Sequence, residues 1–197
     1  MTRRTPTGAA VLQPEVTRSI TEAVLDELAE QGHARLSMES VAKRAGVGKS
    51  ALYRRWPSKH DMVLAVISEF SVGLAVSPDT GSLREDVRAT LTAIVGWLTH
   101  PRFSRILPDM IAEGARNPAM YEVFDAAIGA PRRAQGEAML RRAIDREELP
   151  ADLDMEIALD LLAAPIYWRF MVRGAGQPPE YLDSLTDMLL RALGAKV

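Results

Sequence analysis

The sequence predicts an all-α protein, and three observations support this prediction. Apolar residues recur at intervals of three or four along most of the 197 residues, which is the spacing that places them on one face of a helix. Proline and glycine separate these amphipathic stretches, where they end helices. No segment alternates apolar and polar residues as a half-buried strand does. A chain of this length has room for a small domain beside a larger one.

The first helix is expected over residues 14–31. Val16, Ile20 and Leu28 fall on one stripe of it. Gly32 supplies its end, because glycine is favoured where a helix stops. The stripe predicts that this helix covers the two short helices that follow.

Two short helices around a tight turn are expected over residues 37–56. Ser37 can cap the first of them, and Gly46 can adopt the positive φ that closes it. The second runs from residue 48 or 49 to Trp56, and Pro57 stops it because proline lacks an amide hydrogen. Two helices joined this closely are typical of a helix-turn-helix.

The second short helix exposes polar and cationic side chains if Val47, Leu52 and Trp56 face inward. The exposed groups donate hydrogen bonds and carry positive charge, which suits base edges and phosphates. Ser58 is then expected to cap a further helix, whose first amides can hold a backbone phosphate together with Lys59. The side chains left toward solvent on the second short helix are Lys49, Ser50, Tyr53, Arg54 and Arg55.

The segment AGVGKSALYRRWPSKHDMV, residues 45–63, resembles the helix-turn-helix signature of the TetR family of bacterial transcriptional regulators. The resemblance rests on Ala-Gly-Val, on the Leu-Tyr pair, on the aromatic residue before the proline and on Ser-Lys at the next helix start. It covers about the first third of the chain. Gly48 departs from the usual small hydroxyl residue, and Ser50 with Ala51 replaces the usual Gly-Thr, so fewer hydroxyl groups are available for DNA.

The resemblance implies an N-terminal three-helix helix-turn-helix DNA-binding domain followed by a C-terminal helical ligand-binding and dimerisation domain. We expect the first over residues 1–57, with a flexible basic arm at 1–13, and the second over residues 58–197, with a connector helix at 58–76. The implied partner is double-stranded operator DNA. The predicted DNA contacts are Ser37, Glu39, Lys49, Ser50, Ala51, Tyr53, Arg54, Arg55 and Lys59.

Charge is distributed unevenly along the chain. Residues 1–60 hold ten Lys plus Arg against six Asp plus Glu, whereas the whole chain has a net charge of -2. The positive end is therefore the end with the motif, as counterion release at a phosphate backbone requires. Arg3 and Arg4 can reach a minor groove as a flexible arm, or they can simply belong to a frayed terminus.

The rest of the chain reads as amphipathic helices separated by proline and glycine. The longest of them contains Gly129 and Pro131, and the missing donor of Pro131 must kink the helix or divide it in two. The expected helices are 58–76, 82–99, 103–115, 119–148, 152–172 and 179–193.

The last two helices carry more apolar surface than one chain can easily hide. One face can turn inward and another toward a second copy. The family resemblance implies a homodimer in which these helices pair with their counterparts as a four-helix bundle. The predicted interface residues are Leu161, Ile166, Phe170, Leu182, Leu185 and Leu189.

Aromatic residues and methionines in the second domain are candidates for lining a ligand pocket, although such residues also form ordinary cores. Their mixture predicts a small apolar or aromatic effector. Its binding would shift a dimeric repressor toward a form that cannot span a near-palindromic operator. The candidates are Trp97, Phe103, Met110, Tyr121, Phe124, Met139, Tyr167 and Trp168, with further polar options at Arg105 and Asn117.

Other function classes are disfavoured by what the sequence lacks. It has no cysteine and only three widely spaced histidines, so we expect no disulfide, metal site or cofactor. No run is long and apolar enough for a membrane span or a signal peptide, which predicts a cytoplasmic protein. Two alternatives stay open: a DNA-binding regulator that needs no ligand or is switched by a protein, and a helical enzyme. Asp109 and Glu113, the best carboxylate pair, are explained as a solvated helix face, so we expect no enzyme.

Overall fold

The computed structural model of the chain describes residues 13–73 and 78–196. These residues form helices and no strand, which confirms the all-α prediction. No helix among them is both long and apolar enough to cross a membrane. Arg3 and Arg4, and the end of the predicted connector at 74–76, lie outside the described residues. The elements are α1 (Pro14–Arg35), α2 (Met38–Ala45), α3 (Lys49–Tyr53), α4 (Lys59–Gly73), α5 (Leu83–Leu98), α6 (Phe103–Gly114), α7 (Pro118–Phe124), the π-helical turn η1 (Asp125–Gly129), α8 (Ala130–Asp145), α9 (Met155–Tyr167), the π-helical turn η2 (Trp168–Val172) and α10 (Tyr181–Ala192).

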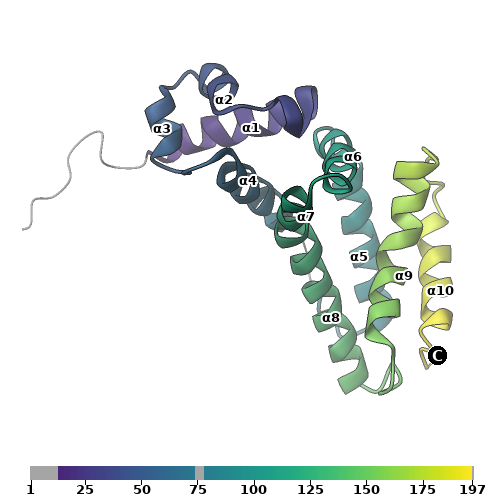
Figure 1. Cartoon of the computed structure of the whole chain (residues 1–197). Helices are drawn as coiled ribbons and strands as arrows, with labels where there is room; N and C mark the ends of the chain where they lie inside the picture. The colour runs from purple at the N-terminus through teal and green to yellow at the C-terminus, as the bar shows by residue number, and fades with distance from the viewer. Residues whose placement is uncertain (1–12, 74–77, 197) are drawn as a thin grey trace, which may run out of the picture.

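Helices α1 to α3 gather at one end of the molecule, and α5, α8, α9 and α10 extend away from them (Figure 1). α1 packs on α2 and also on α6. Ile20, Val24 and Leu28 of α1 are buried together with Val41 and Leu52 of the two short helices. The predicted apolar stripe of the first helix therefore does cover the helix-turn-helix.

Gly32 interrupts α1 at the residue where the sequence predicted the first helix to end. Gly32 has the non-helical values φ 75° and ψ 168°, and the chain forms a further short helical turn after this kink, up to Arg35. Beside the kink, the His33 N–H donates to Asp109 Oδ2 of α6 at 2.8 Å.

α4 connects the two parts of the molecule. It packs on α1 on one side and on α7 and η1 on the other. Met62, Val63, Val66 and Ile67 are buried between them. Because these elements are closely packed, a displacement of α7 or η1 would displace α4 as well.

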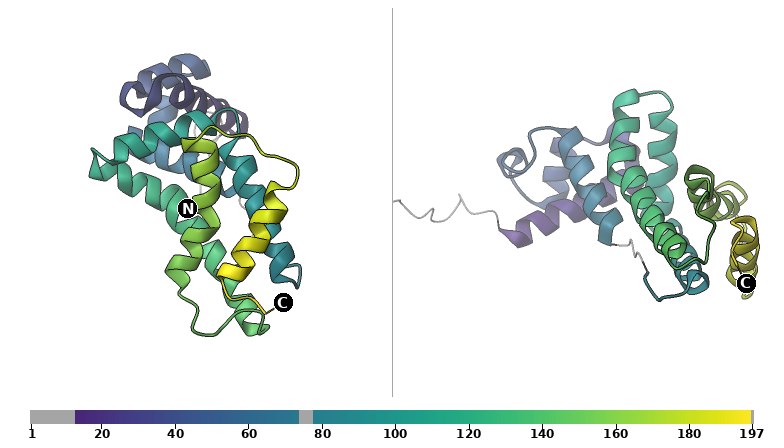
Figure 2. Two further views of the ribbon diagram at one scale, coloured as in Figure 1. Left: turned by 90° about the vertical axis from the view of Figure 1, so that its right-hand side faces the viewer. Right: turned by 90° about the horizontal axis from the view of Figure 1, so that it is seen from below.

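The C-terminal part is a bundle in which α5 contacts α6, α8, α9 and α10. α9 and α10 form its outer layer, and no other element covers them when the molecule is seen from that side (Figure 2, left). At Gly129 and Pro131 the chain passes through η1 directly into α8. A π-helical turn accommodates the proline, because the wider turn shifts the hydrogen bonds that Pro131 cannot complete.

Candidate functional site

The helix-turn-helix is built by local caps. Ser37 Oγ accepts from the Ser40 N–H at 3.0 Å, and Ser40 Oγ accepts from the Ser37 N–H, which closes a reciprocal capping box. Gly46 adopts the left-handed conformation, with φ 67° and ψ 29°, and ends α2. α3 follows with Gly48 as its N-cap, which offers no side-chain hydrogen bond. Both ends of α2 are thus fixed by residues that the sequence singled out.

α3 is shorter than predicted. It ends at Tyr53, and Arg54 and Arg55 continue as a turn toward Trp56, whose N–H donates to Leu52 O at 2.9 Å. Leu52 is fully buried and Trp56 is half-buried. The inward-facing side of α3 is therefore as expected, although its helical part has only five residues.

Four of the predicted DNA contacts form an exposed, donor-rich surface on α3 and the turn after it. Tyr53 is 54% exposed. Lys49, Ser50 and Arg54 are also exposed. Ammonium, hydroxyl, phenol and guanidinium groups all donate hydrogen bonds, which is what phosphate oxygens and the purine acceptors of the major groove need. We call Lys49, Ser50, Tyr53 and Arg54 the reading surface.

Lys49 of the reading surface is paired with Glu39 across the turn. Its Nζ lies 2.8 Å from Glu39 Oε2. The hydrogen bond raises the pKa of Lys49 and lowers the pKa of Glu39. Any anionic group that binds Lys49 must compete with this carboxylate.

Three predicted DNA contacts have partners or burial within the protomer. Ala51 is buried at 8% exposure. Arg55 is half-buried and braces α3 against α1: its Nε donates to Thr17 Oγ1 at 2.9 Å and its Nη1 to Ala51 O at 2.9 Å. Lys59 Nζ donates to His33 O at 2.9 Å, and burial lowers the pKa of Lys59. Sequence spacing placed these residues near DNA but could not show these competing partners.

Polar contacts that the sequence did not predict join α1 to α6. Arg102, at the start of α6, lies 2.7 Å from Glu22 Oε2 and 2.8 Å from Asp26 Oδ1 of α1. At the other end of this contact between α1 and α6, Asp109 of α6 accepts from the His33 N–H of α1. α6 is therefore tied to α1, the helix that covers the two short helices. No local signal marks these pairs, because their members are far apart in sequence.

We expect the stability of the protein to be more sensitive to substitution of Gly32 than of Gly46, another glycine with positive φ. A Cβ on Gly32 would stand 2.8 Å from Asp109 Oδ1, whereas one on Gly46 meets nothing within 4 Å. The backbone of Gly32 also lies in a region that is almost restricted to glycine, while Gly46 is in the left-handed helical region that other residues tolerate. We expect Gly32→Ala to lower the free energy of unfolding by roughly 2–3 kcal/mol and Gly46→Ala by roughly 1 kcal/mol. Urea denaturation measures both, and equal losses would contradict a specific Gly32–Asp109 joint.

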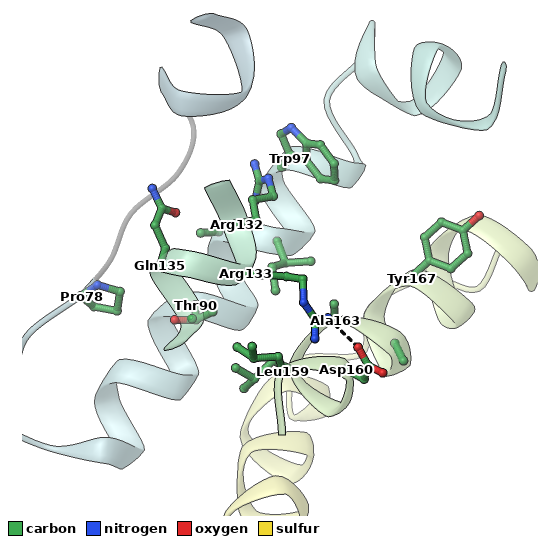
Figure 3. A pocket seen from close by; sticks show the side chains of 15 residues that line it. Pro78, Thr90, Trp97, Arg132, Arg133, Gln135, Leu159, Asp160, Ala163 and Tyr167 are labelled. Atoms are coloured by element: carbon green, nitrogen blue, oxygen red, sulfur yellow. Dashed lines mark hydrogen bonds and ion pairs between the residues drawn. The ribbon is translucent and has the colours of Figure 1, made fainter. Parts of the chain in front are cut away.

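A cavity of about 440 Å³ lies between α5, α8 and α9 (Figure 3). Its size is within the range of small-molecule sites. Its wall is mainly apolar, with cationic and polar groups at separate points. The lining residues are Pro78, Thr90, Ala93, Ile94, Trp97, Arg132, Arg133, Gln135, Gly136, Leu159, Asp160, Leu162, Ala163, Ala164 and Tyr167.

Only Trp97 and Tyr167 of the predicted pocket residues line this cavity. Phe103, Met110 and Met139 are buried in the core, where Phe103 packs on Trp97 with ring centroids 4.1 Å apart. The other three candidates lie elsewhere: Tyr121 and Trp168 are exposed, and Phe124 is half-buried without lining the cavity. Neither polar option lines it, since Arg105 and Asn117 belong to or follow α6. The sequence pattern missed Arg132 and Arg133, because one apolar helix face does not reveal which charges lie at its edge.

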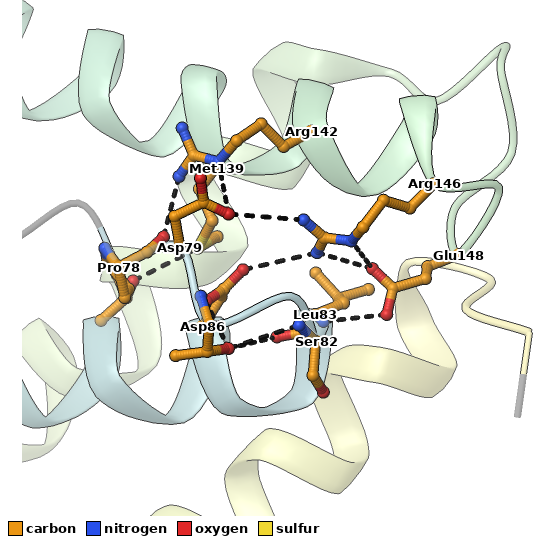
Figure 4. Close-up of polar contacts among 11 residues, drawn as sticks. Pro78, Asp79, Ser82, Leu83, Asp86, Met139, Arg142, Arg146 and Glu148 are labelled. Carbon is orange, nitrogen blue, oxygen red and sulfur yellow. Dashed lines mark hydrogen bonds and ion pairs between the residues drawn. The ribbon is translucent and has the colours of Figure 1, made fainter.

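A network of polar residues holds the loop before α5 next to the cavity (Figure 4). We call this network the polar lock, and it consists of Thr80, Asp86, Arg142, Arg146 and Glu148. Asp86 is fully buried and accepts from the Thr80 N–H and Thr80 Oγ1, both at 2.8 Å. Arg146 Nη2 lies 3.4 Å from Asp86 Oδ2 and 2.6 Å from Glu148 Oε2. Arg142 Nη2 donates to the carbonyl of Pro78, which lines the cavity, at 2.8 Å. The lock therefore fixes one wall of the cavity.

The predicted interface residues are mostly inside the protomer. Ile166, Leu182, Leu185 and Leu189 are at most 9% exposed, because α9 and α10 each turn an apolar stripe onto α5. These four therefore offer little surface to a second chain, and Leu161 and Phe170 are half-buried. The exposed large apolar residues of this region are Ile157 and Met188, at 59% and 61%, with Trp168 and Val172 in η2.

Two family models match this chain. Residues 20–66 match the model of "Bacterial regulatory proteins, tetR family". Residues 77–189 match "Tetracyclin repressor-like, C-terminal domain". The first match ends within α4 and the second begins after it, so the boundary lies where the fold passes from the helix-turn-helix to the bundle.

Individual proteins are similar to the chain over most of its length. The transcriptional regulator YdeS of Bacillus subtilis is 27% identical over 176 residues, which cover 89% of this chain and 84% of YdeS. The DNA-binding transcriptional repressor TetR of Mycobacteroides abscessus is 28% identical over 183 residues, covering 90% of this chain and 94% of that protein. The crystal structure of the TetR family transcription regulator SCO0332 matches with a TM-score of 0.71 at 29% identity, over 90% of this chain and 97% of that one. All three of these proteins are transcriptional regulators. The chain therefore belongs to the TetR family of DNA-binding transcriptional regulators.

Proposed function

We propose that the chain is a homodimeric repressor that leaves a near-palindromic operator when a small molecule fills the cavity between α5, α8 and α9. The observation that carries this proposal is the presence of two separate surfaces in one molecule. The exposed reading surface on α3 suits DNA, and the 440 Å³ cavity suits a ligand.

A second copy of the chain is needed to bind the second half-site of an operator with two-fold symmetry. The uncovered outer helices α9 and α10 expose Ile157 and Met188, and η2 exposes Trp168 and Val172. Large apolar side chains exposed over neighbouring elements are typical of a protein interface. We therefore place the dimer interface on these four residues, with Leu161 and Phe170 at its half-buried edge.

The path from cavity to DNA runs through α4 and α6. Trp97, in the cavity wall, packs on Phe103 of α6. α6 is tied to α1 by Arg102 and Asp109, and α4 packs on η1, which leads directly into the α8 wall. Some ligands bind better when the two DNA-binding domains of the dimer are too close or too far apart for the operator. Such a ligand shifts the population away from the DNA-bound form, and bound DNA lowers the affinity for the ligand by the same factor.

The decisive experiment is selection of genomic DNA fragments by the purified protein, followed by binding assays on the selected operator. Two half-sites related by a dyad are expected, with centres about one helical turn or more apart. Compounds related to the neighbouring genes are then added. An operator without two-fold symmetry would contradict the dimeric reader, and an operator complex that no compound weakens would favour the alternative of a ligand-independent or protein-switched regulator.

Substitutions in the reading surface should separate reading from positioning. Lys49→Ala and Ser50→Ala are expected to change base preference, because both side chains leave the first turn of α3. Tyr53→Ala should weaken all operator variants to a similar extent, since a phosphate contact carries no sequence information. Glu39→Gln should strengthen binding a few-fold and steepen its salt dependence, because it releases Lys49.

Fluorescence anisotropy on a set of operator variants at several salt concentrations measures these effects. Arg141→Gln is the charge control, because Arg141 is an exposed residue of α8 outside the cavity lining. If Lys49→Ala, Ser50→Ala and Tyr53→Ala behaved alike on all variants, the division into reading and positioning contacts would be wrong.

A further inference from the structure

Arg132 is a half-buried cation that has no carboxylate partner among the described residues. It lies in the first turn of α8 and lines the cavity. Its Nε has a long hydrogen bond of 3.4 Å to Ser71 Oγ, and its guanidinium carbon lies 3.9 Å from the centroid of the Trp97 ring. Its Nη2 is buried and has no hydrogen-bond partner among the described residues. Burial lowers the pKa of Arg132 to about 10, so the group is still charged at neutral pH.

The neighbouring arginine shows what a satisfied cation in the same wall looks like. Arg133 Nη1 lies 2.7 Å from Asp160 Oδ1 of α9, and its Nη2 also pairs with Glu156. In Figure 3, Arg133 points toward Asp160, whereas Arg132 lies beside the Trp97 ring. Among the described residues that line the cavity, Asp160 is the only carboxylate, and it is already paired with Arg133. In this part of the wall the positive charge of Arg132 is left without a paired carboxylate.

A second donor without an acceptor stands next to this charge. Trp97 Nε1 is buried and has no partner among the residues that the structure describes, and Trp97 lines the cavity as well. Buried donors normally find acceptors, and a desolvated cation is costly unless an anion or several hydrogen bonds compensate it. Trp97 Nε1 and Arg132 Nη2 would therefore both be stabilised by a hydrogen-bond acceptor. The positive charge of Arg132 favours an acceptor that is negatively charged.

We infer that the molecule bound in this cavity is a carboxylate on an apolar or aromatic body, with the carboxylate at Arg132 and the body along Ile94, Leu159 and Leu162. This inference rests on the proposed function only for the role of that molecule as the effector. A carboxylate accepts two hydrogen bonds from a guanidinium edge, and such charge-assisted bonds are stronger than neutral ones. An alcohol of the same shape accepts without neutralising the charge, and an amine adds a second cation to it.

Matched probes test the inference on the full chain without DNA. Decanoate is compared with decan-1-ol and decylamine, and naphthalene-2-carboxylate with naphthalen-2-ylmethanol, by calorimetry and by quenching of tryptophan fluorescence. We expect each carboxylate to bind at least about tenfold more tightly than its alcohol, and decylamine to bind more weakly than both. Arg132→Gln should reduce the carboxylate-to-alcohol ratio to about one, while Arg141→Gln, which removes the same charge from an exposed site on α8, should leave it unchanged.

The inference is overturned if the alcohols bind as well as the carboxylates, if the preference survives in Arg132→Gln, or if neither carboxylate binds below about 1 mM. Arg132→Met supplies a measurement that needs no ligand. Since the cation has no counterion, its replacement should leave the melting temperature unchanged or raise it. A fall of several degrees would assign Arg132 to the core and overturn the inference.

The outcome for DNA is distinguishable from the outcome for the site. A carboxylate that binds through Arg132 but leaves the operator complex intact supports the site and contradicts the proposed release mechanism. An uncharged or cationic compound that fills the cavity and releases DNA supports the proposed function and overturns the assignment of an anion.

Discussion

Replacing Ile157 and Met188 together by glutamate should convert the proposed dimer into a monomer and weaken operator binding by at least about a hundredfold. Both side chains are large, apolar and about 60% exposed in the protomer, on α9 and α10 respectively. At an interface with a two-fold axis each substitution occurs twice, so four carboxylates would be buried without partners. The loss of DNA affinity follows because a dimer binds its second half-site at a high effective concentration, whereas a monomer binds each half-site alone.

Sedimentation equilibrium measures the first effect and anisotropy on the operator measures the second. Tyr121→Glu is the matched control, because Tyr121 is equally exposed, at 59%, but lies on α7. It should leave both the mass and the affinity unchanged. A double variant that still sedimented as a dimer would move the interface elsewhere, and wild-type protein that was monomeric at micromolar concentration would exclude the dimer altogether.

Asp86→Ala should lower the free energy of unfolding by about 3–5 kcal/mol. Asp86 is fully buried and accepts two hydrogen bonds of 2.8 Å from Thr80, in addition to its ion pair with Arg146 at 3.4 Å. Alanine leaves these donors facing a space that was filled by a carboxylate. It also loosens the loop that carries Pro78 in the cavity wall, so we expect the binding of any cavity ligand to weaken together with stability.

Asp79→Ala is the control for the whole network, and it should cost less than about 1 kcal/mol. Asp79 approaches Arg142 and Arg146 at 3.5 and 3.8 Å, but its side chain is 62% exposed, so water replaces it easily. Guanidinium denaturation of both variants gives the comparison. If the two losses agreed within error, burial would not be what makes Asp86 important, and the polar lock would have no structural role.

The parts of the fold that depend on near neighbours were predictable. The Ser37 cap and the left-handed Gly46 each depend on a few adjacent residues and on the limits of φ and ψ. For the same reason the helix bounds were close to those observed from residue 82 onward, apart from the two π-helical turns. The donor-rich face of α3 also followed from helical spacing, so Lys49, Ser50, Tyr53 and Arg54 were placed correctly toward solvent.

The sequence left open the cases in which a residue has two possible partners. Arg55 and Lys59 stay predicted DNA contacts, and in the protomer they donate to Thr17 and to the carbonyl of His33. α9 carries two competing apolar stripes, and only its packing on α5 selects Ile166 for the core and leaves Ile157 exposed. A sequence pattern cannot decide such cases, because the competing groups are equal in local propensity and differ only in which distant element reaches them.

By itself, the sequence determined that the chain is helical, approximately where most of its helices lie, and that residues 45–63 form a TetR-type DNA-reading motif, because these properties follow from local backbone preferences and side-chain spacing. Only the tertiary structure decided which apolar faces are buried, how α6 is tied to α1, and where the cavity lies. It alone left Arg132 half-buried with no acid beside it among the described residues, while giving Arg133 two. Burial and charge pairing are set by contacts between residues far apart in the chain, and these contacts exist only once the helices have packed.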